Sequence, residues 1–513
     1  MMAHLPIAPI LLPFLVGTLL LALRRLSLPA QRVLALVSVL VQIGAAIALL
    51  AAVSGGDILV YRLGDWPAPW GIVLVADRLS AWMVLITTLL ALWALIYASH
   101  GIDGQGRHFH VLFQMQLFGL AGAFLTGDLF NLFVFFEILL IASYGLALHG
   151  GGKARTRAGL HYVVMNLAGS TVFLFAAGLI YASMGSLNMA DLAAKAGTLA
   201  PDMLGLARAG GLLLLAVFAL KAALLPLHLW LPAAYSGTSA PVAALFAIMT
   251  KVGIYAILRS HTLLFGDSAG PLANLFDPWL MPLALATIVI GTLGVLAADS
   301  LGRLSGYLVL VSVGTLLTAV AVGTNGIAAA LYYLPHSTFT AALLFLLSDA
   351  IRRRRLLHRD GFKPDADMPR HALWGGLFFA AAVAVTGLPP LSGFIGKFLI
   401  LRAAPGQPWV WAVILLAALL VVIALARAGS QVFFNSQATT AALASKPGAS
   451  PAEVALPGVS GSSARELLAV GGLLGLILAL TVFAGPALDY ANATAQQLTD
   501  SARYISAVLG GRP

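Results

Sequence analysis

The chain has 513 residues, of which 60% are hydrophobic and only 9% are charged. Soluble domains carry roughly 25% charged residues, so this composition excludes a soluble protein and indicates an integral membrane protein. The net charge of +10 does not indicate a nucleic-acid-binding surface, because most of the basic excess lies in short loops, and the lack of cysteine excludes a thiolate-bound iron–sulfur cluster or a disulfide in this chain.

Fourteen apolar segments are long enough to cross a bilayer, since a spanning helix needs about 20 residues. The first segment has no basic stretch before it, so we interpret it as a span and not as a cleaved signal peptide. The sequence therefore predicts an all-α polytopic membrane protein with about fourteen transmembrane helices. The predicted spans lie near residues 5–23, 33–53, 79–99, 109–127, 129–148, 161–184, 209–231, 241–263, 278–298, 303–322, 326–348, 372–402, 409–434 and 467–487.

The basic residues predict the orientation of these spans. Most of the 29 Lys and Arg residues fall in the connections on one side, including Arg24, Lys153 and the run from Arg352 to Arg355. The positive-inside rule places those connections in the cytoplasm. With an even number of spans, both termini are then expected outside.

Glu137, in the fifth span, is the one acidic residue that lies well inside an apolar segment. Pairing it with a buried lysine offsets the desolvation of both groups. We expect Lys221 in the seventh span to be this partner, while the sequence leaves open which lysine Glu137 faces.

The seventh and eighth spans each carry one lysine among apolar residues, Lys221 and Lys251. A charge near the bilayer centre costs about 2.5–3.5 kcal/mol or more, so such a residue marks an ion or proton path. Pro226 interrupts the seventh span because it lacks an N–H, and Pro232 is expected to add a second break. His228 lies between these prolines and is a candidate proton relay, since imidazole titrates near neutrality.

The twelfth predicted span is interrupted in the same way. Pro389 and Pro390 break it, Lys397 follows two turns later, and His336 in the eleventh span is a second candidate relay. The twelfth span stands five spans after the seventh, and this odd offset gives the two opposite orientations, as an inverted-topology repeat requires. The symmetry is imperfect, because the tenth span holds no acidic counterpart of Glu137.

The repeat predicts the domain organisation of the chain. We expect spans 1–3 over residues 1–108, a first repeat of spans 4–8 over 109–263, a second repeat of spans 9–13 over 278–434, a polar linker over 435–465, and span 14 with a tail over 466–513. No phosphate-binding loop, metal-ligand cluster or nucleophile–base pair emerges, so neither a catalytic site, a metal nor a cofactor is expected.

Four segments resemble one known family: TGDLFNLFVFFEILLIASYGL (Thr126–Leu146), ALKAALLPLHLWLPAAY (Ala219–Tyr235), MTKVGIYAILR (Met249–Arg259) and LPPLSGFIGKF (Leu388–Phe398). They resemble the antiporter-like membrane subunits shared by respiratory complex I and the multisubunit monovalent cation/proton antiporters called Mrp, Mnh, Sha or Pha. Within that family the chain is most similar to the D-type subunits of the antiporters. The resemblance implies a proton path through residues at matching positions: Glu137, Lys221, Lys251, His336 and Lys397.

The chain departs from that family pattern at one place. Many relatives carry a lysine about one turn after the eleventh-span histidine, whereas Thr340 and Ala341 occupy the region here. The connection between the central lysine and Lys397 is then expected to use water or His336.

The function implied by the resemblance is that of one component of a multisubunit monovalent cation/proton antiporter in the bacterial inner membrane. It conducts protons along a Glu/Lys/His axis coupled to Na⁺ or K⁺ efflux, with other subunits of a hetero-oligomeric complex and lipid as partners and without nucleic acid. The alternative is a proton-pumping membrane subunit of a redox complex of the NADH:quinone oxidoreductase or membrane hydrogenase type. A transporter that works alone is a third possibility.

Overall fold

The computed structural model describes residues 2–23, 25–355, 358–363, 365, 368–434 and 463–510. Within these residues, twelve helices are long and apolar enough to cross a bilayer. Two shorter apolar helices, Phe109–Leu125 and His371–Thr386, occupy the fourth and the twelfth predicted spans. Every predicted span thus coincides with helical structure. The prediction of a polytopic helical membrane protein is confirmed, while a short β-hairpin departs from the predicted all-α fold.

The N-terminal part contains three spanning helices and a small hairpin. The helices and strands are η1 (Met2–Ile7), α1 (Ala8–Ala22), α2 (Leu28–Val53), β1 (Leu59–Arg62), η2 (Leu63–Asp65), β2 (Val73–Ala76), α3 (Arg78–Ala98) and η3 (Ile102–Gly104). The antiparallel hairpin pairs Leu59 with Ala76 in the segment between α2 and α3. Asp77 begins α3 in a capping box, in which its side chain accepts from the Ser80 N–H and the Ser80 hydroxyl accepts from the Asp77 N–H.

Two successive groups of helices follow, and both have the same order. The first group contains α4 (Phe109–Leu125), α5 (Leu129–Leu148), α6 (Lys153–Met184), α7 (Met189–Ala196), α8 (Leu204–Ala222), α9 (Trp230–Gly237), α10 (Ala240–Phe246), α11 (Met249–Arg259) and η4 (Ser260–Leu264). After η5 (Asp267–Leu272), the second group contains α12 (Asp277–Ala297), α13 (Leu301–Ala321), α14 (Thr324–Arg352), α15 (His371–Thr386), α16 (Ser392–Ala403), α17 (Pro408–Gly429) and η6 (Ser430–Phe434). Each group has three continuous spanning helices, then an interrupted one (α8–α9 and α15–α16), then one more.

The seventh predicted span is divided into α8 and α9. Ala223 leaves α8 in the left-handed conformation (φ 60°), and Pro226 lies in the segment between the two helices. The expected second break at Pro232 is wrong, because Pro232 lies in the first turn of α9. An N–H in that turn has no carbonyl four residues back within the helix, so its loss leaves the helix intact.

The twelfth span is divided between Thr386 and Ser392. Gly387 ends α15 with φ +77°, and Pro389 and Pro390 follow in the connecting segment. The eighth span continues from α10 into α11 shortly before Lys251. Ala247 and Ile248 keep right-handed helical angles at this junction, and their N–H groups bond to carbonyls three residues back, so the helix is tightened there but not broken.

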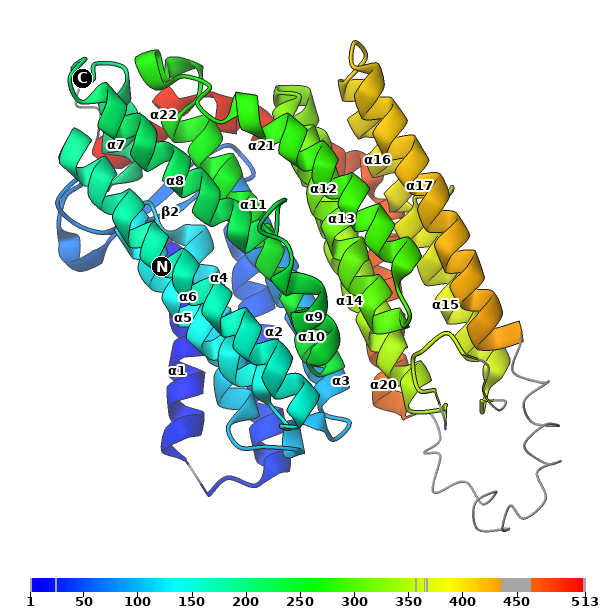
Figure 1. Ribbon diagram of the computed structural model, residues 1–513. Coiled ribbons are helices and arrows are strands. Elements are labelled where there is room, and N and C mark those ends of the chain that lie inside the picture. Colours follow the sequence, from blue (N-terminus) through cyan, green and yellow to red (C-terminus); the bar gives the residue numbers. More distant parts are fainter. Residues whose placement is uncertain are drawn as a thin grey trace, which may run out of the picture.

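The C-terminal part contains α20 (Ala464–Val482), α21 (Ala484–Thr499) and α22 (Ser501–Leu509). The expected tail is thus two helices, which run across the top of the bundle in Figure 1. η1 and α22 both pack on β1, so the two ends of the described chain lie at the same end of the bundle. This placement is what an even number of spans requires. Most of the expected polar linker, residues 435–462, lies outside the described residues.

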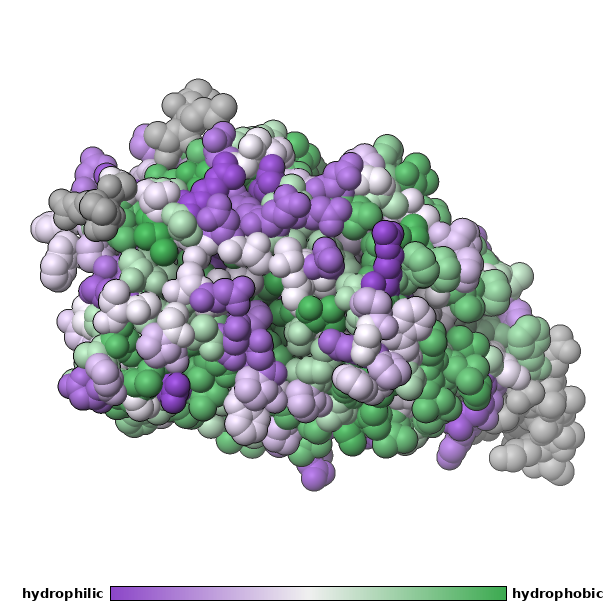
Figure 2. Space-filling model, turned by 90° about the horizontal axis from the view of Figure 1, so that it is seen from above, coloured by the Kyte–Doolittle hydropathy of each residue, from purple (hydrophilic) through white to green (hydrophobic). Residues whose placement is uncertain are grey.

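The end of the bundle that carries α21 and α22 is polar. Figure 2 shows hydrophilic residues gathered over this end and hydrophobic residues along much of its rim. Such a distribution is what a helix bundle with lipid-facing sides and water-facing ends requires.

A buried ionic cluster joins the helices of the N-terminal part. Asp103 in η3 accepts hydrogen bonds from Arg32 Nε (2.6 Å) and Nη2 (2.7 Å) on α2, and lies 3.1 Å from His110 Nε2 on α4. Burial opposes ionisation of Asp103, but hydrogen bonds from Arg32 and His110 outweigh burial and lower its pKa to about 2. The carboxylate thereby ties α2 to α4.

Asp103→Asn is expected to destabilise the protein at pH 7 by about 2 kcal/mol, because Arg32 loses its charged partner. A lowered carboxylate pKa stabilises the fold above the ordinary Asp value of about 4, and this contribution is lost as the pH falls towards 2. Thermal unfolding in detergent should therefore show a constant difference from wild type above pH 5 and a shrinking one below pH 4. Asp202→Asn at an exposed position is the control, and an equal loss in both variants would contradict the assignment.

Candidate functional site

Lys221 lies in the last turn of α8, directly before the interruption of the seventh span. Its side chain is buried, and the surrounding polar groups come from α6. Lys221 Nζ donates to the Asn166 side-chain oxygen (3.1 Å) and lies 3.4 Å from the Asn166 main-chain oxygen. Asn166 Nδ2 donates to the Tyr162 carbonyl (2.9 Å), which turns the amide oxygen towards the lysine. The ammonium is therefore held by neutral acceptors at membrane depth.

Glu137 is half-buried on α5 and accepts a hydrogen bond from the Ser170 hydroxyl on α6. No ion pair within 4 Å joins Glu137 to Lys221 among the described residues, in contrast to the expected direct pairing. Instead, Asn166 and Ser170 contact the two charged groups from one face of α6. The sequence interpretation missed both residues, although a polar pair four residues apart in an apolar helix was a visible signal.

Lys251 lies on α11 and is fully buried. Its Nζ is 3.4 Å from the Ser312 hydroxyl on α13. Gly253, half a turn later, packs against the end of α8, where a Cβ on this glycine would lie 2.4 Å from the Ala222 nitrogen. Only glycine permits this approach, which brings the helix of Lys251 against the residue that follows Lys221.

A cavity of about 10 Å³ lies between these two helices. Its lining includes Asn166 and Lys221 on one side and Met249 and Val252 of α11 on the other. The space therefore separates the surroundings of Lys221 from the helix that carries Lys251.

Lys397 lies on α16 and reaches back across the interruption to α15. Its Nζ donates to the carbonyl oxygens of Thr386 (2.7 Å) and Val385 (3.3 Å). These carbonyls belong to the C-terminal turn of α15, where the partial charge of the helix dipole is negative and favours a cation. The interruption thus supplies the acceptors for the lysine.

His336 lies on α14, beside Lys397 of α16, and is buried. Its Nδ1 is 2.9 Å from the Ser392 hydroxyl at the start of α16, and its Nε2 is 3.5 Å from the Thr340 hydroxyl. A Cβ at Gly393 would lie 2.6 Å from the imidazole, so a glycine there lets α16 approach this closely. Thr340, which stands where many relatives carry a lysine, therefore contacts the histidine.

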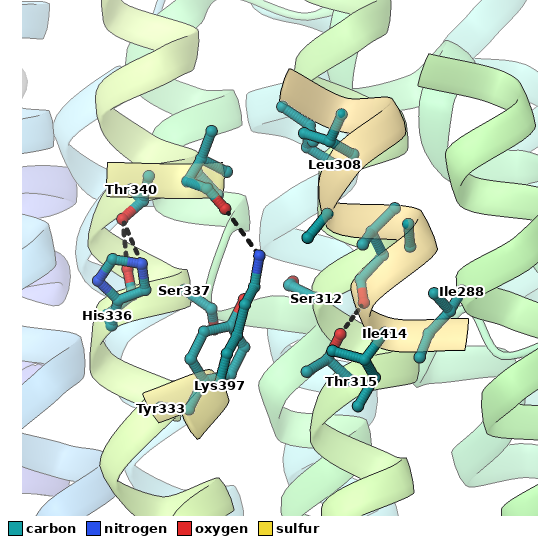
Figure 3. A pocket seen from close by; sticks show the side chains of 16 residues that line it. Ile288, Leu308, Ser312, Thr315, Tyr333, His336, Ser337, Thr340, Lys397 and Ile414 are labelled. Carbon is teal, nitrogen blue, oxygen red and sulfur yellow. Dashed lines mark hydrogen bonds between the residues drawn. The ribbon is translucent and has the colours of Figure 1, made fainter. Parts of the chain in front are cut away.

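A second cavity, of about 20 Å³, lies between Lys397 and α13. Figure 3 shows Lys397, His336 and Thr340 on one side of it and Ser312 and Thr315 on the other. Ser312, which lines this cavity together with Lys397, is also the contact of Lys251, whereas Lys251 itself does not line it. The volume of the cavity suffices for a water molecule.

His228 is not brought into this arrangement. It lies in the segment between α8 and α9, is buried, and lines neither of the two cavities. Within the described part of the chain, its Nδ1 has no hydrogen-bond partner. His228 therefore contributes to the interruption and not to the contacts around the lysines.

The described residues contain no group of three or more His, Cys, Asp and Glu side chains placed to hold a metal ion. The groups that the fold does bring together are lysines, a carboxylate, an imidazole and hydroxyls. Their common chemistry is to donate, accept and exchange protons.

Comparisons with known proteins identify relatives along the whole chain. A family model described as NADH:quinone oxidoreductase/Mrp antiporter, TM, matches residues 126–424. The D-type subunit of a probable K(+)/H(+) antiporter of Rhizobium meliloti is 42% identical, covering 99% of this chain and 98% of the relative. The D-type subunit of a Na(+)/H(+) antiporter of Alkalihalophilus pseudofirmus is 37% identical, covering 99% and 100%. A chain in the structure of the Mrp complex from Dietzia sp. DQ12-45-1b aligns with a TM-score of 0.83 and 28% identity over 99% of both chains.

Gly253→Ala is expected to force α11 away from α8 and to destabilise the fold by about 1–3 kcal/mol, since its Cβ would overlap backbone. The measurement is the thermal unfolding midpoint of the purified protein in detergent. Gly178→Ala on α6 is the matched control, because its Cβ would meet nothing within 4 Å. Equal midpoints for both variants would show that α11 does not need this close approach.

Proposed function

This chain belongs to the NADH:quinone oxidoreductase/Mrp antiporter family of membrane subunits, and from that premise we propose that it conducts protons at the membrane midplane of a multisubunit monovalent cation/proton antiporter. It is a transporter subunit and not an enzyme. The observation that carries the proposal is a row of polar side chains that passes both lysine-bearing helix interruptions. We call it the polar row; it comprises Glu137, Ser170, Asn166, Lys221, Lys251, Ser312, His336 and Lys397.

The polar row consists of three contact groups separated by two cavities. Glu137, Ser170, Asn166 and Lys221 form the first, and Lys251 with Ser312 forms the second. His336 and Lys397 line the far side of the larger cavity and form the third, with Thr340 beside His336. A proton moving along the row crosses these two gaps. The larger cavity has room for a water molecule, which is the carrier that we propose there.

Each lysine of the polar row has acceptors that stabilise its ammonium form. Lys221 uses Asn166, Lys251 uses Ser312, and Lys397 uses the end of α15. A buried ammonium that loses its acceptor pays the desolvation cost alone, which favours release of its proton. Small movements of α6, α13 or α15 therefore change which lysine holds the proton, and we propose that such changes couple proton steps to cation movement.

Many relatives carry a lysine about one turn after His336, and this chain has none there. We propose that His336 performs the proton transfer instead. His336 lies beside Lys397 and shares the cavity that reaches Ser312. A neutral imidazole has one donor and one acceptor nitrogen and passes a proton by changing tautomer. We assign the connection between Lys251 and Lys397 to His336 together with water in this cavity.

The two ends of the polar row are the least buried of its charged members. Glu137 and Lys397 are both half-buried, whereas Lys221 and Lys251 are buried. The relatives are named as subunits, and the Dietzia structure is that of a complex. We propose that other subunits of the assembly cover these ends, that the cation is Na⁺ or K⁺, and that the multi-pass protein resides in a bacterial inner membrane. We also propose that residues 109–263 and 278–434 are the two repeats of the transporter.

Lys251→Ala is expected to abolish cation-dependent proton movement, because it removes the central group of the polar row. Everted vesicles that contain the chain with its partner subunits are energised, and the dequenching of a pH-gradient dye is recorded on adding Na⁺ or K⁺ salts. Lys195→Ala, which removes an exposed lysine on α7, is the control and should leave dequenching unchanged.

Dequenching that persists in Lys251→Ala would overturn the assignment of the proton path. If wild-type vesicles respond to neither cation, and proton movement instead follows an electron donor such as NADH, the chain works in a redox complex.

His336→Gln is expected to reduce the dequenching rate about tenfold or more, since glutamine cannot carry the proton across the larger cavity. His228→Gln should have a smaller effect, because His228 lines neither cavity. Rates are compared at equal amounts of assembled complex on a native gel. A stronger loss in His228→Gln would place the relay in the interruption of the seventh span.

A further inference from the structure

We propose that Ser170 and Asn166 of α6 are positioning residues that couple the protonation of Lys221 to that of Glu137 without direct contact between the two. The proposal deepens the proposed function and rests on it for its transport readout. It assigns a role to two neutral residues of the polar row, in addition to the roles of its charged residues.

The geometry places one atom, the main-chain carbonyl oxygen of Asn166, between two competing donors. The Ser170 hydroxyl lies 3.1 Å from this oxygen, and Lys221 Nζ lies 3.4 Å from it. The same hydroxyl also donates to the Glu137 carboxylate. A hydroxyl carries a single proton, so Ser170 donates fully either to Glu137 or to the Asn166 carbonyl.

The competition links the two charges. When Lys221 carries its proton, its ammonium group donates to the main-chain carbonyl of Asn166. The Ser170 hydroxyl is then free to donate to an ionised Glu137 through a charge-assisted hydrogen bond. When Lys221 has lost its proton, its hold on the carbonyl weakens, and Ser170 turns back to its own helix. The ionised carboxylate then loses a donor at the moment when the lysine is neutral.

The position of α6 makes this coupling sensitive to distance. Gly169 lies between the two polar residues, where a Cβ would be 2.4 Å from Leu220 and 3.8 Å from Lys221 Nζ. The helices therefore approach closely enough for Lys221 to reach the main chain of α6. Ser170 and Asn166 lie four residues apart, so they present one face to both partners.

Few other titratable groups face Glu137. Lys221 on α8 and Tyr144 on α5 itself interact with it electrostatically. Of the helices that pack against α5, α4 carries His110, which contacts Asp103, and α6 carries Tyr162, whose hydroxyl is 2.7 Å from that of Ser143. The other titratable residues of α6 are Lys153, Arg155, Arg157, His161 and Tyr181. α10 contributes none. The hydroxyl of Ser170 donates to Glu137 and is the route that we propose in addition to the direct electrostatic interaction with Lys221.

The test compares Ser170→Ala, Ser170→Thr and Thr171→Ala in the assembled complex. Thr171 is exposed on the next position of α6, and its hydroxyl bonds only to Leu167 of its own helix (3.2 Å). In vesicles, Ser170→Ala should move the pH of half-maximal antiport up by about one unit, because a hydrogen bond to an ionised group is worth about one such unit. Ser170→Thr should restore the wild-type profile, and Thr171→Ala should not change it.

A second readout does not depend on transport. Infrared difference spectra of the purified complex, titrated with pH, show the carboxyl stretch of Glu137, which Glu137→Gln identifies by its disappearance. This titration should shift upward by about one pH unit in Ser170→Ala and stay unchanged in Ser170→Thr.

The outcomes separate the two proposals. An unchanged carboxyl titration in Ser170→Ala, or an equal shift in Ser170→Thr, would overturn the coupling even where antiport is present. A shifted titration in a complex that exchanges no cation would leave the coupling standing and remove the proposed function. A purely structural role of Ser170 would lower the amount of assembled complex and leave both pH profiles in place, which also counts against the proposal.

Discussion

The cost of holding an ammonium group inside a bilayer is the constraint on which the rest of this structure depends. The three lysines of the polar row lie within spanning segments, and each has different hydrogen-bond acceptors for its ammonium group. Lys397 donates to the last carbonyls of an interrupted helix, Lys221 donates to an asparagine of α6, and Lys251 lies beside a serine of α13. Neutral acceptors satisfy the charge without neutralising it permanently. That choice suits a path in which protons must leave as well as arrive.

The helix interruptions and the glycines also help to accommodate these buried charged groups. Pro226 lies in one interruption, and Pro389 and Pro390 lie in the other, so main-chain carbonyls become available where an unbroken helix would use them. Gly253 and Gly393 then let neighbouring helices approach close to Lys221 and His336. Interruption supplies the acceptors, and close packing brings the donors within reach.

The C-terminal helices hold the central lysine helix at one end of the bundle. Arg259, two turns after Lys251 on α11, forms a bidentate pair with Asp77 at the start of α3 (2.6 and 2.9 Å), and the Tyr504 ring of α22 packs on its guanidinium. Burial opposes ionisation of Asp77, but the Arg259 charge outweighs it and lowers the pKa of Asp77. Gln497 of α21 donates to the Gly56 carbonyl (3.0 Å) and extends the same attachment.

The sequence by itself determined a polytopic helical membrane protein, the interruptions near Pro226 and Pro389, and which charged residues lie inside apolar segments. Each of these follows from composition or from the cost of a charge in an apolar run, which are local properties. Only the tertiary structure decided which acceptors the lysines use. Asn166, Ser170 and Ser312 are ordinary polar residues until α6 and α13 bring them to the charges, and Glu137 faces Ser170 and not Lys221.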